Sequence, residues 1–306
     1  MIEPQYDKSI EFLQAFRSTG FWVLTAIKTD KKGIETTTFA VTEVDEVRTW
    51  LEEHGDNHNI YFSVNPTIRV VAKKAEREDI RELAYLHVDI DPRAGEDIEA
   101  ERARALERLT TDLPESIPPP TFIVDSGGGY HGYWFLDEPL PIDGESAKYE
   151  EAARYNMQIE VLFDGDSCHN VDRIMRLPGT VNRPDKNKLA KGRTTRLATL
   201  VEHHPERIYS IRDFTPAPLV QQTEDFGFSG GGTNLVKIES DNIQRLDHVD
   251  DLGDDVPQQC KIVIVQGDDP DVVLLAHPLA GEGHQPAIGR PAHRAVVVRM
   301  TCDVDR

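Results

Sequence analysis

LHVDID, residues 86–91, places two aspartates, Asp89 and Asp91, at the end of an apolar run. The wider run ELAYLHVDID alternates and is rich in strand-forming residues, so it predicts a buried β-strand. Residues two apart on a strand face the same side, which puts both carboxylates on one face, close enough to hold one divalent cation. The alternative is a strand that simply reaches solvent at a turn, since Pro92 follows at once.

A second feature is VDSGGGYHGYWFL, residues 124–136, in which two predicted strands flank three consecutive glycines. A tight hairpin needs one or two glycines, whereas three allow backbone N–H groups to approach an anion closely, as in phosphate-binding loops. His131 alternates with Tyr133 after this loop, so both should face one side, where a histidine can donate to a phosphate or bind a metal. The alternative is a glycine-rich hairpin with a half-buried histidine.

A third feature is FDGDSCHNVDRIMRLPGTVNRP, residues 163–184, which supplies the acids Asp164, Asp166 and Asp172. Between residues 171 and 196 the chain carries eight Lys or Arg against two Asp, a local charge of +6 in a protein whose formal net charge is −20. A basic loop beside a carboxylate cluster suits a site that holds a metal, a triphosphate and a nucleic-acid backbone together. The alternative is a solvated charged loop.

The order VDID, SGGGYH and D-x(6)-RIMRLPGTVN resembles the archaeo-eukaryotic primase superfamily. Within it, the chain is most similar to the RepB-like and primase-polymerase domains of plasmid, phage and virus replication proteins. The motifs of that family are a paired acid on a strand, a small-residue loop ending in histidine, and a third acid before an arginine-rich strand. All three occur here in order, over roughly residues 85–190.

The resemblance implies a metal site built from Asp89, Asp91 and a third acid. Asp166 is preferred for the third place because it stands ten residues before Arg176, close to the family's usual offset. Asp172 is the alternative third ligand, and otherwise would be a salt-bridge partner that orients the adjacent Arg173. Carboxylate and phosphate oxygens are hard ligands, so Mg²⁺ or Mn²⁺ is the expected metal.

The resemblance also assigns residues around the substrates. The expected nucleotide-binding residues are Ser126, Gly128, Gly129, His131, Arg173 and Arg176. The expected nucleic-acid-binding residues are Asn182, Arg183, Lys186 and Lys188, with Lys191 and Arg193 in the same basic loop.

The implied activity is that of a DNA primase or primase-polymerase, a nucleotidyltransferase that uses two metal ions. It would synthesise primers from NTPs or dNTPs on a single-stranded DNA template during replication of a plasmid, virus or mobile element. The sequence contains no G-x-x-x-x-G-K-[ST] pattern, so a separate replicative helicase is the expected partner.

Two other functions compete with this one. The first is a non-catalytic replication-initiation protein that binds DNA on the same scaffold; the intact Asp89, Asp91, His131 and Arg176 argue against it. The second is an unrelated D-x-D nuclease or transferase, which would have no use for RIMRLPGTVN after the histidine loop.

Composition sets limits on this interpretation. The 306 residues suffice for one large domain and a smaller appendage. No apolar run of about 18 residues occurs, which predicts no membrane span, and the polar start MIEPQYDKSI is not a signal peptide. The three cysteines are too scattered for a disulfide framework or zinc site, which favours a reducing, cytoplasmic setting. The excess of 54 Asp and Glu over 34 Lys and Arg is typical of proteins adapted to high salt.

Hydrophobic periodicity predicts a mixed set of elements. Helices are expected at residues 8–17, 43–54, 96–113, 144–163 and 205–214. Strands are expected at residues 21–27, 35–41, 60–65, 82–91, 121–125, 130–136 and 194–203. This order predicts an α+β fold around a central, mainly antiparallel sheet flanked by helices. The resemblance adds that the sheet is the RRM-like palm of a primase.

The chain is expected to contain three regions. Residues 1–216 would form the catalytic domain. Residues 217–258 would be an acidic, glycine-containing flexible linker, because residues 221–260 carry nine acids against two bases. Residues 259–306 would be a small C-terminal segment of uncertain structure, in which only KIVIVQGDDPD has an ordered pattern.

Overall fold

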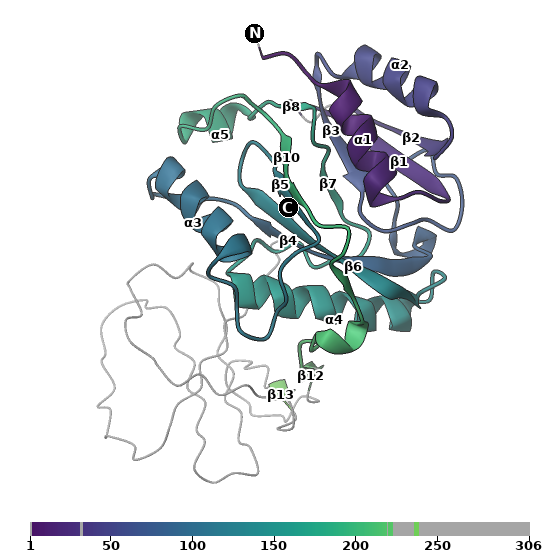
Figure 1. The fold of residues 1–306 in the computed structure, drawn as a ribbon, viewed down its shortest axis with the longest axis vertical. Coiled ribbons are helices and arrows are strands. Elements are labelled where there is room, and N and C mark those ends of the chain that lie inside the picture. The colour runs from purple at the N-terminus through teal and green to yellow at the C-terminus, as the bar shows by residue number, and fades with distance from the viewer. Residues whose placement is uncertain (1, 31–32, 219, 223–235, 239–306) are drawn as a thin grey trace, which may run out of the picture. The chain divides into compact units, whose positions relative to one another are not determined.

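The computed structural model describes residues 2–30, 33–218, 220–222 and 236–238, and the chain divides into two units, residues 1–216 and 217–306. The first unit has the α+β fold that the sequence predicts, with antiparallel sheets flanked by helices (Figure 1). Its long strands form two sheets, however, where the sequence predicted a single central one.

The first sheet has the strand order β2 (Ile34–Ala40), β1 (Phe21–Lys28), β3 (His58–Ser63) and β7 (Ile174–Arg176), and each neighbouring pair is antiparallel. Strand β1 is central, and its residues 22–26 are all buried, as expected for a strand covered on both faces. The edge strand β2 is mostly exposed or half-buried, in keeping with its run of threonines.

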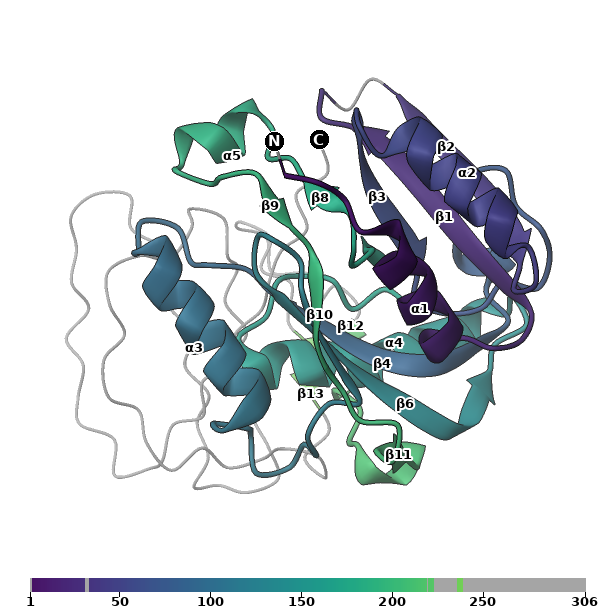
Figure 2. The same ribbon diagram turned by 45° about the horizontal axis from the view of Figure 1, so that its top comes forward.

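Helices α1 (Tyr6–Phe16) and α2 (Val44–His54) pack with this sheet in one hydrophobic cluster. Figure 2 shows α1 between the two sheets. Phe12 of α1 lies 5.1 Å from Phe62 of the first sheet and 5.8 Å from Phe122 of the second, between ring centroids. Phe16 stacks on Tyr85 of the second sheet at 3.9 Å. The buried aromatic side chains of α1 therefore hold the two sheets together.

The second sheet has the order β10 (Thr199–His203), β5 (Phe122–Asp125), β6 (Tyr130–Pro141) and β4 (Glu82–Ile90), again antiparallel. The short strand β11 (Ile208–Tyr209) pairs in parallel with β6. Helices α3 (Ile98–Thr110) and α4 (Ser146–Phe163) cover one face of this sheet, where they share a second hydrophobic cluster with β4 and β6.

Strand β4 is buried on both faces, and this determines which side chains reach the site. Leu86, Val88 and Ile90 are fully buried in the cluster beneath α3 and α4. Burial of each such side chain contributes roughly 1.5–3 kcal/mol. Because side chains alternate along a strand, His87 and Asp89 face the opposite side. The apolar residues thus fix the register that orients Asp89.

Several short elements differ from the sequence prediction. The expected strand at 194–203 is divided into β9 (Arg196–Leu197), which pairs with β8 (Val181–Asn182), and β10, which belongs to the second sheet. The expected helix at 205–214 is instead β11 followed by a 3₁₀ turn, η2 (Ile211–Asp213). Residues expected as a basic loop form a short helix, α5 (Lys186–Ala190), capped by the Asp185 side chain. A further 3₁₀ turn, η1 (Arg77–Asp79), precedes β4.

In the second unit, β12 (Val220–Gln222) pairs antiparallel with β13 (Val236–Ile238). Most of the expected linker at 217–258 and all of the segment at 259–306, with KIVIVQGDDPD, lie outside the described residues and stay predictions. Within the described part of the chain, no helix is long and apolar enough to cross a membrane.

Candidate functional site

Two of the three acids of the candidate site come from the end of β4. Asp89 is opposite His131 in the pairing of β4 with β6. Asp91 follows the last residue of the strand, two positions on, so both carboxylates lie on the face away from α3 and α4. Carboxylate oxygens of Asp89 and Asp91 lie within 4.8 Å of each other, as the alternation predicted.

The third acid, Asp166, comes from the turn that follows α4. Asp164 ends the helix in the left-handed conformation, with φ of 53°. Gly165 then packs against β4 so closely that a Cβ atom would lie 2.7 Å from Val88 Cγ2. The Asp166 amide donates to the Asp89 carbonyl oxygen at 2.8 Å. As a result, carboxylate oxygens of Asp89, Asp91 and Asp166 all lie within 4.8 Å of one another.

Asp172, the alternative third acid, lies outside this cluster. Its carboxylate accepts hydrogen bonds from the Tyr149 hydroxyl and, at 3.1 Å, from Asn170 Nδ2. Lys74 Nζ lies 3.3 Å from its other oxygen. The expectation that Asp172 pairs with an arginine was wrong, since a tyrosine, an asparagine and a lysine are its partners.

The proximity of the three carboxylates makes their ionisation unfavourable. Burial, followed by the charges of Asp91 and Asp166, raises the pKa of Asp89 to about 8. Although Asp166 is the most exposed of the three, desolvation and the charge of Asp91 raise its pKa to about 6. A divalent cation would remove this repulsion, and three carboxylates are the hard oxygen donors that Mg²⁺ or Mn²⁺ prefers. The residues thus fit the expected metal.

His131 adjoins the cluster and is almost fully buried. Its Nε2 lies 3.4 Å from Asp89 Oδ1, and its Nδ1 lies 3.1 Å from the Tyr133 hydroxyl. Burial and the positive charges of Arg176 and Arg173 lower the pKa of His131 to about 3, so the ring is neutral at physiological pH.

Arg176 on β7 is a second buried residue of the site. Its guanidinium lies over the Tyr61 ring at 4.3 Å, and Nη2 donates to the Tyr61 hydroxyl and to Asn182 Oδ1, both at 3.0 Å. Nη1 is buried with no hydrogen-bond partner among the described residues. Arg173, just before β7, donates to Asn170 Oδ1 at 3.5 Å. Its positive charge partly offsets the rise that burial causes in the pKa values of Asp89 and Asp166.

The glycine loop does not present the free amides that the sequence predicted. Gly127 N donates to Asp125 Oδ1 at 2.7 Å, and Gly128 N and Gly129 N donate to Ser126 Oγ at 3.2 and 2.9 Å. The glycines are needed for a different reason. A Cβ on Gly129 would lie 2.1 Å from the Ile90 carbonyl oxygen, and one on Gly128 would lie 3.2 Å from Asp91 Oδ1. The loop is thus packed directly against the acid that it helps to position.

The residues expected to bind nucleic acid occupy different environments. Asn182 Nδ2 donates to the Ser126 carbonyl at 2.9 Å, so Asn182 joins Arg176 to the glycine loop. Arg183 donates to the His58 carbonyl at 3.2 Å and is half-buried, whereas Lys186 is exposed on α5.

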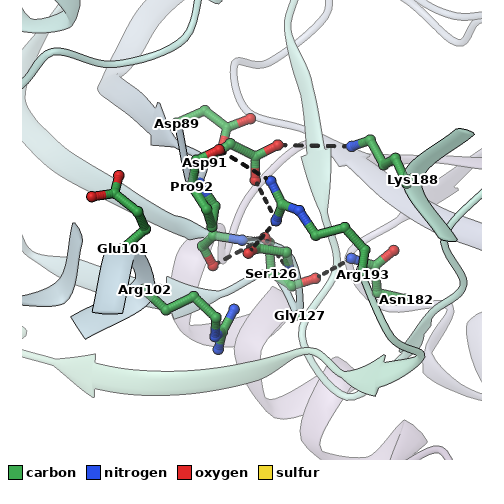
Figure 3. Close-up of polar contacts among 12 residues, drawn as sticks. Asp89, Asp91, Pro92, Glu101, Arg102, Ser126, Gly127, Asn182, Lys188 and Arg193 are labelled. Atoms are coloured by element: carbon green, nitrogen blue, oxygen red, sulfur yellow. Dashed lines mark hydrogen bonds and ion pairs between the residues drawn. The ribbon is translucent and has the colours of Figure 1, made fainter. Parts of the chain in front are cut away.

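Two basic side chains reach the acid cluster itself (Figure 3). Lys188 Nζ lies 3.7 Å from Asp91 Oδ2, and Arg193 Nη1 lies 3.6 Å from Asp91 Oδ1. Arg193 also donates to the Gly128 carbonyl at 2.6 Å. The sequence assigned both residues to nucleic acid, and the local excess of positive charge was the only signal that placed them near the site.

With this geometry in view, the chain can be compared with known proteins. No protein-family model matches it. It is 24% identical over 177 residues to a replication protein of Clostridium perfringens, a match that covers 56% of this chain and 38% of that protein. The match thus spans well under half of the curated relative.

Two solved structures are also similar. One is a crystal structure of primase RepB′, with TM-score 0.43 and 13% identity over 66% of this chain and 57% of that one. The other is the catalytic domain of primase RepB′ in complex with initiator DNA, with TM-score 0.42 and 14% identity over 66% of this chain and 86% of that one.

Proposed function

We propose that this chain is a nucleotidyltransferase that synthesises primers on single-stranded DNA. The observation that carries the proposal is the meeting of three carboxylates within 4.8 Å of one another. The buried His131, one lysine (Lys188) and one arginine (Arg193) border them. Nucleotidyl transfer requires anionic groups that hold a metal, and beside them cationic groups that hold the phosphates.

In the proposed reaction, a 3′-hydroxyl oxygen attacks the α-phosphorus of an incoming nucleoside triphosphate. The new P–O bond forms as the bond from that phosphorus to the β-phosphate oxygen breaks. Pyrophosphate leaves with the electron pair, and the hydroxyl proton passes to solvent. Mg²⁺ or Mn²⁺ bound by Asp89, Asp91 and Asp166 would make the hydroxyl more acidic and neutralise the departing pyrophosphate.

The buried donors of the site suit a triphosphate. His131 is neutral, and when the Tyr133 hydroxyl donates to Nδ1, the proton resides on Nε2, which borders the acid cluster. Arg176 Nη1 is a buried N–H group with no partner among the described residues, and a phosphate oxygen would satisfy it. Lys188 and Arg193 contact Asp91. A metal that neutralised this carboxylate would make both side chains available to the phosphates.

The template strand is proposed to follow the basic segment. Lys186 is exposed on α5, next to Lys188 at the acid cluster. An exposed lysine adds affinity for the phosphates of any sequence. A separate helicase and a role in the replication of a plasmid, virus or other mobile element are part of the same proposal.

The proposal is tested by incubating the protein with unprimed single-stranded DNA, labelled NTPs or dNTPs, and Mg²⁺ or Mn²⁺. New labelled oligonucleotides are the expected product. Shortened template would identify a nuclease. DNA binding without incorporation under any metal would identify a non-catalytic initiation protein.

A further inference from the structure

Strand β4, which carries Asp89, is an edge strand, because among the described strands it pairs only with β6. The backbone N–H and C=O groups on the open side of an edge strand need other partners. Here a side chain and a backbone amide supply them. His87 N donates to Asn156 Oδ1 at 3.0 Å, and the Asp89 carbonyl accepts from Asp166 N at 2.8 Å. Helix α4 and the turn that follows it therefore complete the open edge of β4.

Asn156 joins β4 to the segment that follows α4. Its side chain is completely buried, and while Oδ1 accepts from His87 N, Nδ2 donates to the His169 carbonyl at 3.2 Å. The His87 ring makes a second link. Its Nε2 lies 2.9 Å from the Cys168 carbonyl, and a carbonyl oxygen can only accept, so this nitrogen is the donor. Both links join β4 to the chain just after Asp166.

Glu160 holds the same segment from one helical turn further along α4. It lies four positions after Asn156, and residues at this spacing share one face of a helix. Glu160 Oε2 accepts from Cys168 N at 2.8 Å and lies 3.1 Å from His169 Nδ1. The Glu160 carbonyl accepts from Gly165 N at 2.8 Å. The chain is thus held on both sides of the third acid of the cluster.

The position of Glu160 is unfavourable for an acid that lacks such partners. Its side chain is only 6% exposed, and a buried carboxylate needs hydrogen bonds to offset its desolvation. It also lies in the last turn of α4, where the helix dipole disfavours negative charge. An apolar residue would pack there without either cost. The carboxylate therefore serves the segment that it holds.

The acid cluster needs support of this kind because its members repel one another. Carboxylate oxygens of Asp89, Asp91 and Asp166 lie within 4.8 Å of one another, and like charges favour separation. The scaffold must therefore impose their spacing. Ligands that are already in position bind a metal without the free-energy cost of ordering them.

We propose that Asn156 and Glu160 are positioning residues of the metal site, which hold Asp166 beside Asp89 through their hydrogen bonds to β4 and to residues 165–169. Both act on the backbone that carries the acids and do not themselves belong to the acid cluster. This inference rests on the proposed function, because it concerns how the ligands of that same site are kept in place.

The test measures Mn²⁺ binding and nucleotide incorporation in the same variants. Glu160→Ala removes the acceptor for Cys168 N and the His169 ring, and Asn156→Ala removes both bonds of the amide. In each, the dissociation constant of Mn²⁺, measured from the EPR signal of the free ion, should rise roughly tenfold to a hundredfold. The Mn²⁺ concentration for half-maximal incorporation should rise by the same factor. The rate at saturating Mn²⁺ should return to within about threefold of the wild type, because the metal selects the correctly placed acids.

Glu160→Gln separates hydrogen bonding from charge. The glutamine side-chain oxygen can accept both bonds that Oε2 accepts, so the Mn²⁺ affinity should stay within about threefold of the wild type. A loss as large as that in Glu160→Ala would overturn the inference, because the charge of Glu160 would then act on the metal directly. Glu150→Ala is the matched control and should bind Mn²⁺ like the wild type. It removes an exposed acid of the same helix, which pairs with Arg77.

Thermal melts show which variants are folded. Either alanine variant carries the test if the other does not fold, and Glu160→Gln carries it if neither does. Unchanged Mn²⁺ affinity in a folded alanine variant would overturn the inference, as would a rate that saturating Mn²⁺ does not restore. A wild type that binds Mn²⁺ but incorporates no nucleotide would refute the proposed function instead, and the Mn²⁺ affinities of the variants would still decide the positioning role.

Discussion

At the scale of single residues, Asp89 destabilises the metal-free protein at neutral pH. Its pKa in the folded state is about 8, well above the ordinary value, mainly because of burial. The stability that the protonated group contributes is therefore fully present below about pH 4 and is lost as the pH rises through about 8.

Asp89→Asn should remove this dependence. Near pH 8 in EDTA the variant should melt several degrees above the wild type, since 1 kcal/mol changes the Tm of such a domain by roughly 2–4 °C. Mg²⁺ or Mn²⁺ should then stabilise the wild type and leave the variant unchanged. Melting curves from pH 4 to 8 with and without metal measure both effects. Parallel pH profiles for the two proteins would contradict the interpretation.

His131 and Arg176 should bind substrate rather than template. His131→Ala should weaken nucleotide use far more than binding of single-stranded DNA. Arg176→Lys should also reduce incorporation, by roughly tenfold or more, because lysine cannot make the two bonds to Tyr61 and Asn182 while offering a further donor. Extension kinetics and filter binding on the same samples separate the two effects. An equal loss of DNA binding in His131→Ala would move the histidine to the template side.

At the scale of elements, the glycine loop holds Asp91 in place through close packing. Gly129→Ala would bring a Cβ to 2.1 Å from the Ile90 carbonyl, so the loop or β4 must move. Overpacking of this kind costs roughly 1–3 kcal/mol in stability, and incorporation should fall because Asp91 moves. Gly33→Ala is the control, since its Cβ would meet only the flexible Lys28 side chain. Urea unfolding that gives equal free energies for both variants would contradict the close-packing account.

Some positions of the site residues on these elements could be predicted from the sequence, and others could not. The alternation of ELAYLHVDID correctly placed Asp89 and Asp91 on one face, because the side-chain period of a strand is a local property. The glycine loop was misinterpreted because its amides bind Asp125 and Ser126, a choice that depends on the folded turn. Lys188 and Arg193 lie about 100 positions from Asp91 in the sequence. The local excess of positive charge placed them near the site, but it did not predict that both pair with Asp91. Asp172 accepts a hydrogen bond from the Tyr149 hydroxyl, whereas an arginine was the expected partner.

At the scale of the whole molecule, the chain is strongly acidic but carries one segment with a net positive charge. The formal net charge is −20, whereas residues 171–196 carry +6. Binding of DNA should therefore be confined to the basic segment and weaken steeply with salt.

Lys186→Glu should weaken binding of single-stranded DNA at every sequence and reduce the salt slope by about 0.7 for the lost phosphate contact. Lys148→Ala, which removes an exposed lysine paired with Glu145, is the control. Fluorescence anisotropy over a range of salt concentrations gives both slopes. An unchanged slope in Lys186→Glu would exclude α5 from the DNA path.

The central claim is that Asp89, Asp91 and Asp166 together bind the metal that supports nucleotidyl transfer. The most direct test compares nucleotide incorporation by Asp166→Asn and Asp172→Asn, two acids six positions apart of which only the first lies in the cluster. Asp166→Asn should lose roughly a hundredfold or more in rate with Mg²⁺ or Mn²⁺ and remain folded. Asp172→Asn should keep most of its rate when folded. Full activity in Asp166→Asn, or a folded but inactive Asp172→Asn, would contradict the account.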